Sequence, residues 1–229
     1  MMGPDLRTIE LPVELLTPEV LRMMGCSGAA PIRPEQVALI DRLIDECRHL
    51  VRARAAYVIR AVVRMTDTRL DLRGCPSIYG PIAGFLQAAT RVIVFVVTIG
   101  EEIERLATER MRAGQRLEGY TLDAIGSVAT DAAADAFADH IQMNEAQPCE
   151  AITLPFSPGY CGMSLDEQQT LFSVVDARPI GVELLPTLIM RPIKSVSGLL
   201  GIGQREAVET HGVPCQWCSL EHCRMRRPQ

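Results

Sequence analysis

The sequence has few aromatic residues and no apolar run long enough to span a membrane. Phe, Trp and Tyr make up only 4% of the 229 residues, so Ala, Val, Ile and Leu must fill the interior. The longest apolar stretch, Val92 to Ile99, has about half of the length that crosses a bilayer. We therefore expect this stretch to form a buried β-strand, and we expect no membrane association.

No secretory signal is recognisable either, because charge and proline interrupt the first twelve residues. Without such a signal, the eight cysteines are better explained as thiols or metal ligands in a reducing compartment than as a disulfide framework. The net charge of −5 argues against a surface that binds nucleic acid. These absences predict a cytoplasmic protein that contacts neither nucleic acid nor membrane.

Hydrophobic periodicity divides the chain into helices and short strands. Apolar residues at every third or fourth position predict one long amphipathic helix over residues 35–65, whose arginines we interpret as a solvated face. Further helices are expected over residues 100–114, 119–142 and 164–175, the last with Ser164 as its cap and Glu167 at the capping-box spacing. Strands are expected over residues 91–99, 152–156, 180–184 and 194–203.

This order of elements predicts an α+β fold: a twisted antiparallel or mixed sheet of short strands covered by helices. We expect a helical N-terminal region before the sheet and a cysteine-bearing C-terminal tail after it. The predicted divisions are residues 1–90 for the N-terminal strand and helical region, 91–206 for the α+β core and 207–229 for the tail.

Two segments of the core carry residues suited to a ligand. Asp131, Asp135 and Asp139 recur at every fourth position of a predicted helix and so share one face. The segment LPFSPGYCGMS, residues 154–164, holds two prolines, a Gly-Tyr pair and a cysteine. Spacing alone favours a solvated stripe and an ordinary turn over a ligand site.

Four separated phrases agree in order with one known family. They are VTIGEEIE, LDAIGSVATDAAADAFAD, FSPGYCGMSLDEQQTLF and IGVELLPTLIMRPIKSVSGLLGIG. Together they resemble the activation domain of cobalamin-dependent methionine synthase, and more closely the free-standing proteins similar to that domain. The resemblance covers roughly residues 90 to 205.

The resemblance implies a function. It implies that the chain binds S-adenosylmethionine and sits over a cobalamin carried by another module, so that inactive cob(II)alamin is reduced and methylated. The sequence contains no D-x-H-x-x-G phrase of the kind that ligates cobalamin, so the corrinoid is expected on the partner. The chain would then be an activation subunit of a methyltransferase, and whether it is itself an enzyme stays open.

Residue by residue, the resemblance implies three groups of ligand contacts. The loop of the Gly-Tyr pair would cradle the nucleoside and amino-acid ends through Ser157, Pro158, Gly159 and Tyr160. A helix carboxylate near the ligand's amino group would be Asp135, with Asp131 as the reserve. A strand of small side chains would let a ligand or corrin approach the backbone at Ser195, Ser197 and Gly198.

One position departs from the family pattern. The family usually has Arg four residues before the Gly of the loop, where a guanidinium can pair with the carboxylate of S-adenosylmethionine. Here that position is Pro155. Loss of a charge-assisted pair weakens binding by about 1.5–3 kcal/mol, or one to two orders of magnitude in affinity.

The C-terminal tail carries a metal-ligand pattern. Its cysteines, with the spacing C-x2-C-x4-C, are Cys215, Cys218 and Cys223. Thiolates two residues apart can chelate one metal, either zinc as a structural staple or an iron–sulfur cluster as an electron carrier. Candidates for the fourth ligand are Cys149, Cys161, His211 and His222, and free or redox-sensitive thiols are the alternative to a metal site.

Three functions follow from these observations. The first is reductive activation, with S-adenosylmethionine, of a cobalamin-bearing methionine synthase or another corrinoid methyltransferase, aided by an electron donor protein. The second is an iron–sulfur electron-transfer protein that reduces a corrinoid without S-adenosylmethionine, which Pro155 and the cysteine tail favour. The third is a zinc-stapled interaction module. Metal content and ligand titration would separate them.

Overall fold

An antiparallel sheet of seven strands runs through the computed structural model, which describes residues 5–26, 32–81, 86 and 88–209. The strand order is β4-β3-β2-β5-β9-β6, and β1 pairs with β2 beside this path. Every pairing between these strands is antiparallel, which confirms the predicted α+β class. The strands are β1 (Arg7–Glu10), β2 (Arg54–Thr66), β3 (Arg69–Leu72), β4 (Ile78–Tyr79), β5 (Ala89–Thr98), β6 (Glu150–Ile152) and β9 (Ser195–Gln204).

The central strands are not short, although the predicted bounds of β5 and β9 are nearly correct. β2 has 13 residues, and β5 and β9 have 10 each, so the expectation of short strands is wrong for the middle of the sheet. β5 is buried along most of its length because it pairs with β2 and β9 at its edges and because apolar layers cover both of its faces. Such a strand is covered on both faces and therefore reads as a continuous apolar run.

The predicted helix over residues 35–65 is confirmed for residues 35–47 and is wrong for residues 54–65. A helix, α2 (Pro34–Cys47), is followed by the short 3-10 helix η1 (Arg48–Leu50), and the chain then enters β2. Residues 54–66 are rich in Val, Ile and Tyr, which pack well on a pleated surface, and pairing with three other strands outweighs their fortuitous helical spacing. The N-terminal region is thus not mainly helical, because it supplies β1 to β4.

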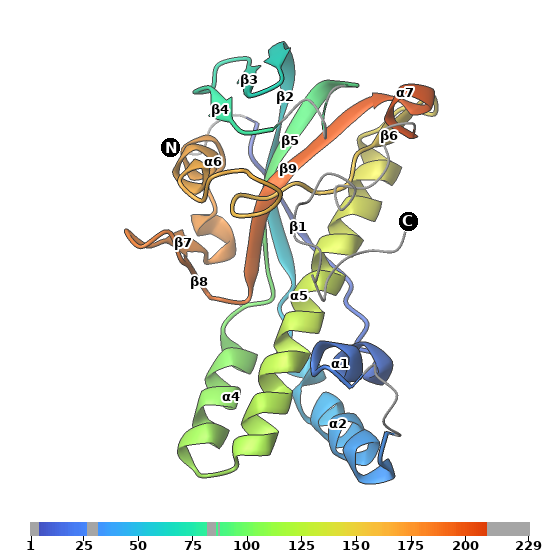
Figure 1. Cartoon of the computed structure of the whole chain (residues 1–229), viewed down its shortest axis with the longest axis vertical. Helices are drawn as coiled ribbons and strands as arrows, with labels where there is room; N and C mark the ends of the chain where they lie inside the picture. Colours follow the sequence, from blue (N-terminus) through green and yellow to red (C-terminus); the bar gives the residue numbers. More distant parts are fainter. Residues whose placement is uncertain (1–4, 27–31, 82–85, 87, 210–229) are drawn as a thin grey trace.

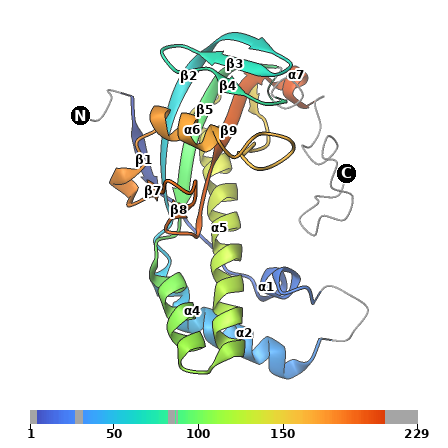
Figure 2. The same ribbon diagram turned by 60° about the vertical axis from the view of Figure 1, so that its left-hand side comes forward.

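The predicted helices in the middle of the chain are confirmed. α4 (Glu102–Arg112) and α5 (Arg116–Asn144) form a hairpin. The first half of α5, which lies beside α4, also packs with α1 (Thr17–Met23) and α2, and its second half lies along the sheet (Figures 1 and 2). α6 (Glu167–Val174) starts later than predicted. Its cap position is Asp166, and the Ser164 hydroxyl instead accepts a hydrogen bond from the Asp166 amide.

Two apolar layers pack on the two faces of the sheet. On one face, Ile93 and Phe95 of β5 and Leu200 of β9 pack against Phe137 and Ile141 of α5. On the other face, alternate residues of the same strands pack under α6, with Leu171 and Val175. The sheet therefore separates an α5 side from an α6 side.

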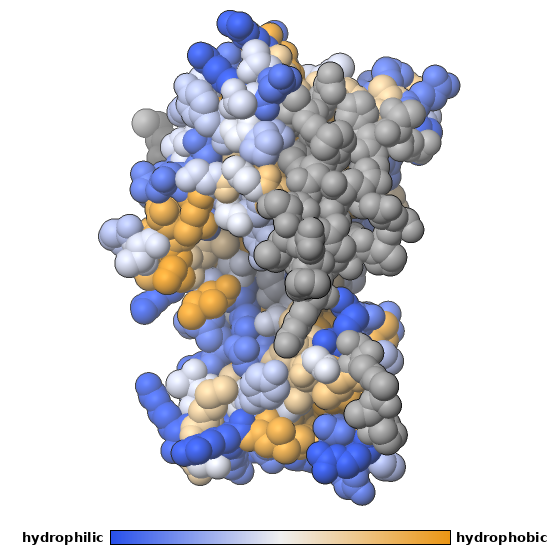
Figure 3. Space-filling view, viewed as in Figure 1, coloured by the Kyte–Doolittle hydropathy of each residue, from blue (hydrophilic) through white to orange (hydrophobic). Residues whose placement is uncertain are grey.

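A small hairpin lies beside α6. It consists of β7 (Glu183–Leu184) and β8 (Met190–Arg191), which follow the 3-10 helix η2 (Arg178–Ile180). Apolar side chains gather on the surface around it (Figure 3), and Ile189 and Ile193 are more than half exposed. The last described helix, α7 (Arg205–Glu209), follows β9 directly. No helix among the described residues combines the length and the apolar character needed to cross a bilayer.

Candidate functional site

The loop that contains Ser157–Tyr160 is fixed to the edge of β9. Phe156 and Leu199 exchange two backbone hydrogen bonds, with N–O distances of 2.9 and 2.8 Å. Next to this bridge, a Cβ atom on Gly198 would lie 2.8 Å from the Phe156 carbonyl oxygen and 2.9 Å from Ser157 Oγ. Only glycine leaves room for the loop at this point. The space beside Gly198 is thus filled by the loop.

Two tight turns then give the loop its shape. The Tyr160 amide donates to the Ser157 carbonyl oxygen at 3.2 Å, with Pro158 and Gly159 (φ 84°) at the central positions, as a type II turn requires. The Met163 amide donates to the Tyr160 carbonyl oxygen at 3.0 Å across Cys161 and Gly162, which both have positive φ. Both turns end at or begin from Tyr160, whose side chain is 67% exposed.

The far end of the loop is held by a buried methionine. Met163 is only 3% exposed, and its side chain packs against Gly80, where an added Cβ would lie 3.3 Å from Met163 Cγ. Pro158 is buried, whereas Gly159 and Tyr160 are exposed. The arrangement therefore presents an aromatic ring and several backbone groups on a loop that is anchored at both ends.

One face of α5 runs along the same edge of the sheet. Ser127 Oγ accepts a hydrogen bond from Lys194 Nζ at 2.9 Å, and Gln142 Oε1 accepts one from the Ile152 amide of β6 at 3.1 Å. At 100° per residue, Asp131 and Asp135 lie within about 80° of arc of Ser127, on the same side of the helix as Gln142. Both aspartates are exposed. We call Ser127, Asp131, Asp135 and Gln142 the edge stripe of α5.

The two contacts of the edge stripe place α5 in register with β9. From Ser127 to Asp135 the helix rises about 12 Å, and from Lys194 to Gly198 the strand advances about 13 Å. Since Ser127 contacts Lys194, Asp135 and Gly198 lie at the same level along the edge. The predicted helix carboxylate therefore comes to the level of the loop's attachment point, with Asp131 one turn nearer to Lys194.

Ser195 and Ser197 lie on the other face of β9. Because side chains alternate along a strand, they point to the α6 side, whereas Val196 and Gly198 point to the α5 side. The Ser195 hydroxyl donates to the Pro192 carbonyl oxygen at 2.7 Å and lies 2.9 Å from Thr98 Oγ1. Ser197 is 2% exposed, and its hydroxyl has no hydrogen-bond partner among the described residues. The sheet thus separates these serines from the aspartates.

Lys194 is a residue of this edge that sequence reasoning missed. Its Nζ lies 2.8 Å from Asp123 Oδ1 and 2.9 Å from Ser127 Oγ, and its side chain is 11% exposed. It is the only lysine among 23 basic residues, and this was the one available signal. Its place as the first residue of a predicted strand gave no indication of its contact with α5.

The predicted metal ligands Cys215, Cys218 and Cys223 lie outside the described residues, as do the candidates His211 and His222. The other two candidates for a fourth ligand, Cys149 and Cys161, lie within the described residues, with Cys149 exposed and Cys161 half-buried. Within the part of the chain that the structure describes, no three Cys, His, Asp or Glu side chains come together as a metal site. A metal at the tail therefore stays a prediction.

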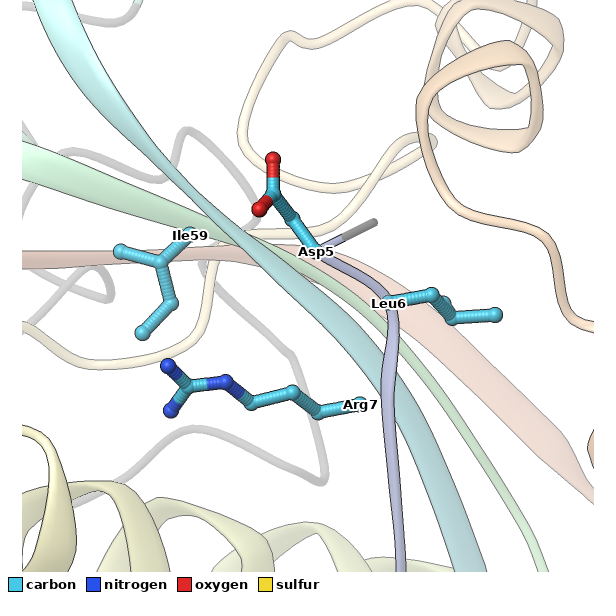
Figure 4. Close-up of a pocket in the computed structure, with 4 residues that line it drawn as sticks. All are labelled: Asp5, Leu6, Arg7 and Ile59. Carbon is cyan, nitrogen blue, oxygen red and sulfur yellow. The ribbon is translucent and has the colours of Figure 1, made fainter. Parts of the chain in front are cut away.

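A small pocket lies away from this edge, at the other side of the sheet's central strands. It has a volume of about 160 Å³ and is lined by Asp5, Leu6, Arg7 and Ile59 of the β1–β2 region (Figure 4). Its charged groups are already paired, since Arg7 binds Glu145 and Asp5 lies 3.2 Å from Arg60 Nη1. This pocket is not connected with the predicted ligand residues.

Comparison with known proteins bears on the fold. No protein-family model matches the chain, and no curated protein matches it. One solved structure that matches is described as "Crystal Structure of the MetH Reactivation Domain bound to AdoHcy", with a TM-score of 0.60 and 16% sequence identity. The match covers 86% of this chain and 78% of that one. The chain therefore has the fold of the MetH reactivation domain, which confirms the resemblance at the level of the fold.

Proposed function

We propose that this protein activates a cobalamin-dependent methyltransferase of the methionine synthase type by presenting S-adenosylmethionine to a corrinoid that the partner carries. The observation that supports this most is the shared fold, since the matching reactivation domain was crystallised with AdoHcy. Within that fold, the Gly-Tyr loop is attached to β9 at the level of an α5 carboxylate. These are the two elements that the sequence resemblance selected for the ligand.

Each residue has a distinct part in the proposal. The backbone of Ser157–Tyr160 and the exposed ring of Tyr160 hold the nucleoside, because an anchored aromatic ring offers stacking area at little cost in entropy. Asp135, with Asp131 one turn away, accepts hydrogen bonds from the ligand's ammonium group. Gly198 acts by letting the loop approach β9, and Ser195 acts by fixing the start of β9 through Thr98.

The chemistry is a reductive methylation. A corrinoid held by the partner would supply the methyl-accepting cobalt once a donor protein had reduced it by one electron, and S-adenosylmethionine would supply the methyl group and leave as S-adenosylhomocysteine. This chain's own residues bind and orient the methyl donor and leave its methyl group facing the partner. The cobalamin-bearing methyltransferase and the electron donor are thus the proposed partners.

Calorimetric titration with S-adenosylmethionine and S-adenosylhomocysteine tests the proposal. We expect binding by the unaltered chain and a loss of about fivefold or more in affinity for Tyr160→Ala, because ring stacking is worth about 1–3 kcal/mol. Tyr120→Ala is the matched control, since Tyr120 is also an exposed tyrosine but lies near the start of α5 and not in the loop. Absence of heat at millimolar ligand with the unaltered chain would refute the proposal.

A second function, electron transfer to a corrinoid through an iron–sulfur cluster, is favoured by one observation. Pro155 stands where the family has the arginine that pairs with the ligand's carboxylate. This function needs a cluster at Cys215, Cys218 and Cys223, and it predicts that anaerobically purified protein is brown and that Cys218→Ser bleaches it. Elemental analysis that finds only zinc would favour a structural tail instead.

A further inference from the structure

The β7–β8 hairpin, which lies beside α6 (Figure 1), has one face that points away from the rest of the molecule. Leu184 and Met190 lie opposite each other and share the inner face, where Met190 packs against the apolar layer on the α6 side of the sheet. Glu183 and Arg191 also lie opposite each other, and because side chains alternate along a strand, they share the other face. Both residues are exposed, so this second face meets solvent.

The same face is apolar closer to the turn of the hairpin. The Leu185 amide donates to the Ile189 carbonyl oxygen at 2.9 Å, which continues the register two residues beyond Glu183 and Arg191 on each strand. Leu185 is half-buried and Ile189 is 51% exposed. The solvent face of a hairpin is ordinarily polar, and here half of it is not. We call Glu183, Leu185, Ile189 and Arg191 the outer face of the hairpin.

The hairpin is fixed to the body of the molecule. Met190 anchors its inner face in the apolar layer. Just after the hairpin, the Ile193 amide donates to Glu104 Oε2 of α4 at 2.9 Å, and the Lys194 carbonyl oxygen accepts from the Ile99 amide at 3.2 Å. The outer face is therefore held in place before any contact forms, which lowers the entropy lost on binding.

We propose that the outer face binds the outer face of a second copy of this chain and so forms a two-fold symmetric dimer. Charge complementarity selects this occupant. A two-fold axis that runs parallel to the strands, between the two faces, places β7 of one copy over β8 of the other. Glu183 of each copy then meets Arg191 of the other, and Leu185 of each copy meets Ile189 of the other. No like charges are opposed, and an apolar centre lies beside charged pairs, as in protein interfaces.

The two charged groups are available for such pairing. Neither Glu183 nor Arg191 has an ion-pair partner within the part of the chain that the structure describes. The outer face belongs to the α6 side, so the dimer leaves the α5 side of the sheet open and does not depend on the proposed function. Four residues form a small surface beside the roughly 800 Å² that each partner buries in a standard interface, so we expect a weak dimer.

Sedimentation velocity from micromolar to millimolar concentration, with two opposite charge reversals, tests the inference. Glu183→Arg gives an outer face with two positive charges, and Arg191→Glu gives one with two negative charges. We expect each variant alone to be monomeric, because like charges meet across the axis, and an equimolar mixture of the two to dimerise at least as well as the unaltered chain. Arg112→Glu, which reverses an exposed arginine at the end of α4, should dimerise like the unaltered chain.

Two results would overturn the inference. One is an unaltered chain that stays monomeric at millimolar concentration, which would leave the outer face to a different protein, such as the corrinoid-bearing partner. The other is a mixture of the two variants that dimerises no better than either variant alone.

A second pair of variants tests the apolar centre. Ile189→Asp should raise the dissociation constant of the dimer at least about tenfold, because it places two carboxylates against the apolar centre. Met143→Asp, which alters a more exposed apolar residue at the end of α5, should leave the constant unchanged. Circular dichroism shows that each variant is folded. Equal constants for Ile189→Asp and the unaltered chain would also contradict the inference.

Discussion

Phe156 and Leu199 exchange a reciprocal pair of backbone hydrogen bonds, at 2.9 and 2.8 Å, which attach the Ser157–Tyr160 loop to the central sheet. Leu199 lies in the middle of β9, and β9 pairs with β5 along its whole length. The loop therefore takes its position from the most buried part of the molecule. A rigid attachment of this kind is what a binding loop needs to hold a ligand at a defined place.

Replacement of Gly198 by alanine should detach this loop. The added methyl group would lie 2.8 Å from the Phe156 carbonyl oxygen and 3.0 Å from Phe95 Cζ, so the loop or the ring must shift. We expect a loss of about 1–3 kcal/mol in the free energy of unfolding, measured by urea denaturation, as is typical of an overpacked site. Unchanged stability together with unchanged ligand affinity would show that the loop does not depend on this contact.

The sequence predicts some parts of this fold much better than others. β5 is a continuous apolar run and α5 is a long Ala-rich periodic segment, so each carries a strong local signal. β2 does not, because residues 54–66 fit helical and strand spacing alike, and only pairing with neighbouring strands decides between them.

The candidate site shows the same limit. Sequence resemblance selected the loop at Ser157–Tyr160 and the aspartates of α5 as separate motifs, but their common level on one edge depends on contacts of Lys194 and Gln142 that no spacing reveals. The alternation along β9 was available from the sequence. It places Ser197 and Gly198 on opposite faces of β9, although the resemblance groups them in one motif.

The stability of the protein should fall at alkaline pH through Tyr57. This tyrosine is 2% exposed and donates to Glu145 Oε1 at 2.9 Å; burial, followed by the nearby Glu145 carboxylate, raises the pKa of Tyr57 above its usual value. The neutral form therefore contributes stability that is complete below the unfolded pKa of about 10 and is lost as the pH rises through the folded pKa.

Urea denaturation between pH 8 and pH 11 measures this effect. Tyr57→Phe should lose about 1 kcal/mol at pH 8 with the hydrogen bond, and its stability should then fall less steeply above pH 10 than that of the unaltered chain. Tyr120→Phe is the control, because Tyr120 is 49% exposed, and it should keep the original slope. Equal slopes for all three proteins would contradict the assignment to Tyr57.

Arg110 should stabilise the packing of the helical end. Its guanidinium binds Glu46 of α2 and lies 2.7 Å from Glu118 of α5, so one α4 side chain joins three helices. Arg110→Ala should cost about 1 kcal/mol, more at low salt than at high salt, because the pairs are only partly buried. Arg105→Ala, on the same helix but 64% exposed, should cost less than about 0.5 kcal/mol. Equal costs would show that Arg110 does not act as a link.

Ser197 should tolerate the loss of its hydroxyl. This buried oxygen has no partner among the described residues, and an unsatisfied buried polar group costs about 1–3 kcal/mol. Ser197→Ala should therefore leave the free energy of unfolding unchanged or raise it, as thermal and urea denaturation would show. A clear destabilisation would mean that the hydroxyl has a partner, and a loss of ligand affinity alone would place the ligand on the α6 side of β9.

A crystal structure of this chain grown with S-adenosylhomocysteine is the most direct test of the account. We predict ligand density on the α5 side of β9, with the nucleoside at Ser157–Tyr160 and the ammonium group of the amino-acid end toward Asp135. Density on the α6 side near Ser197, in the Asp5–Ile59 pocket, or nowhere at saturating ligand would contradict it.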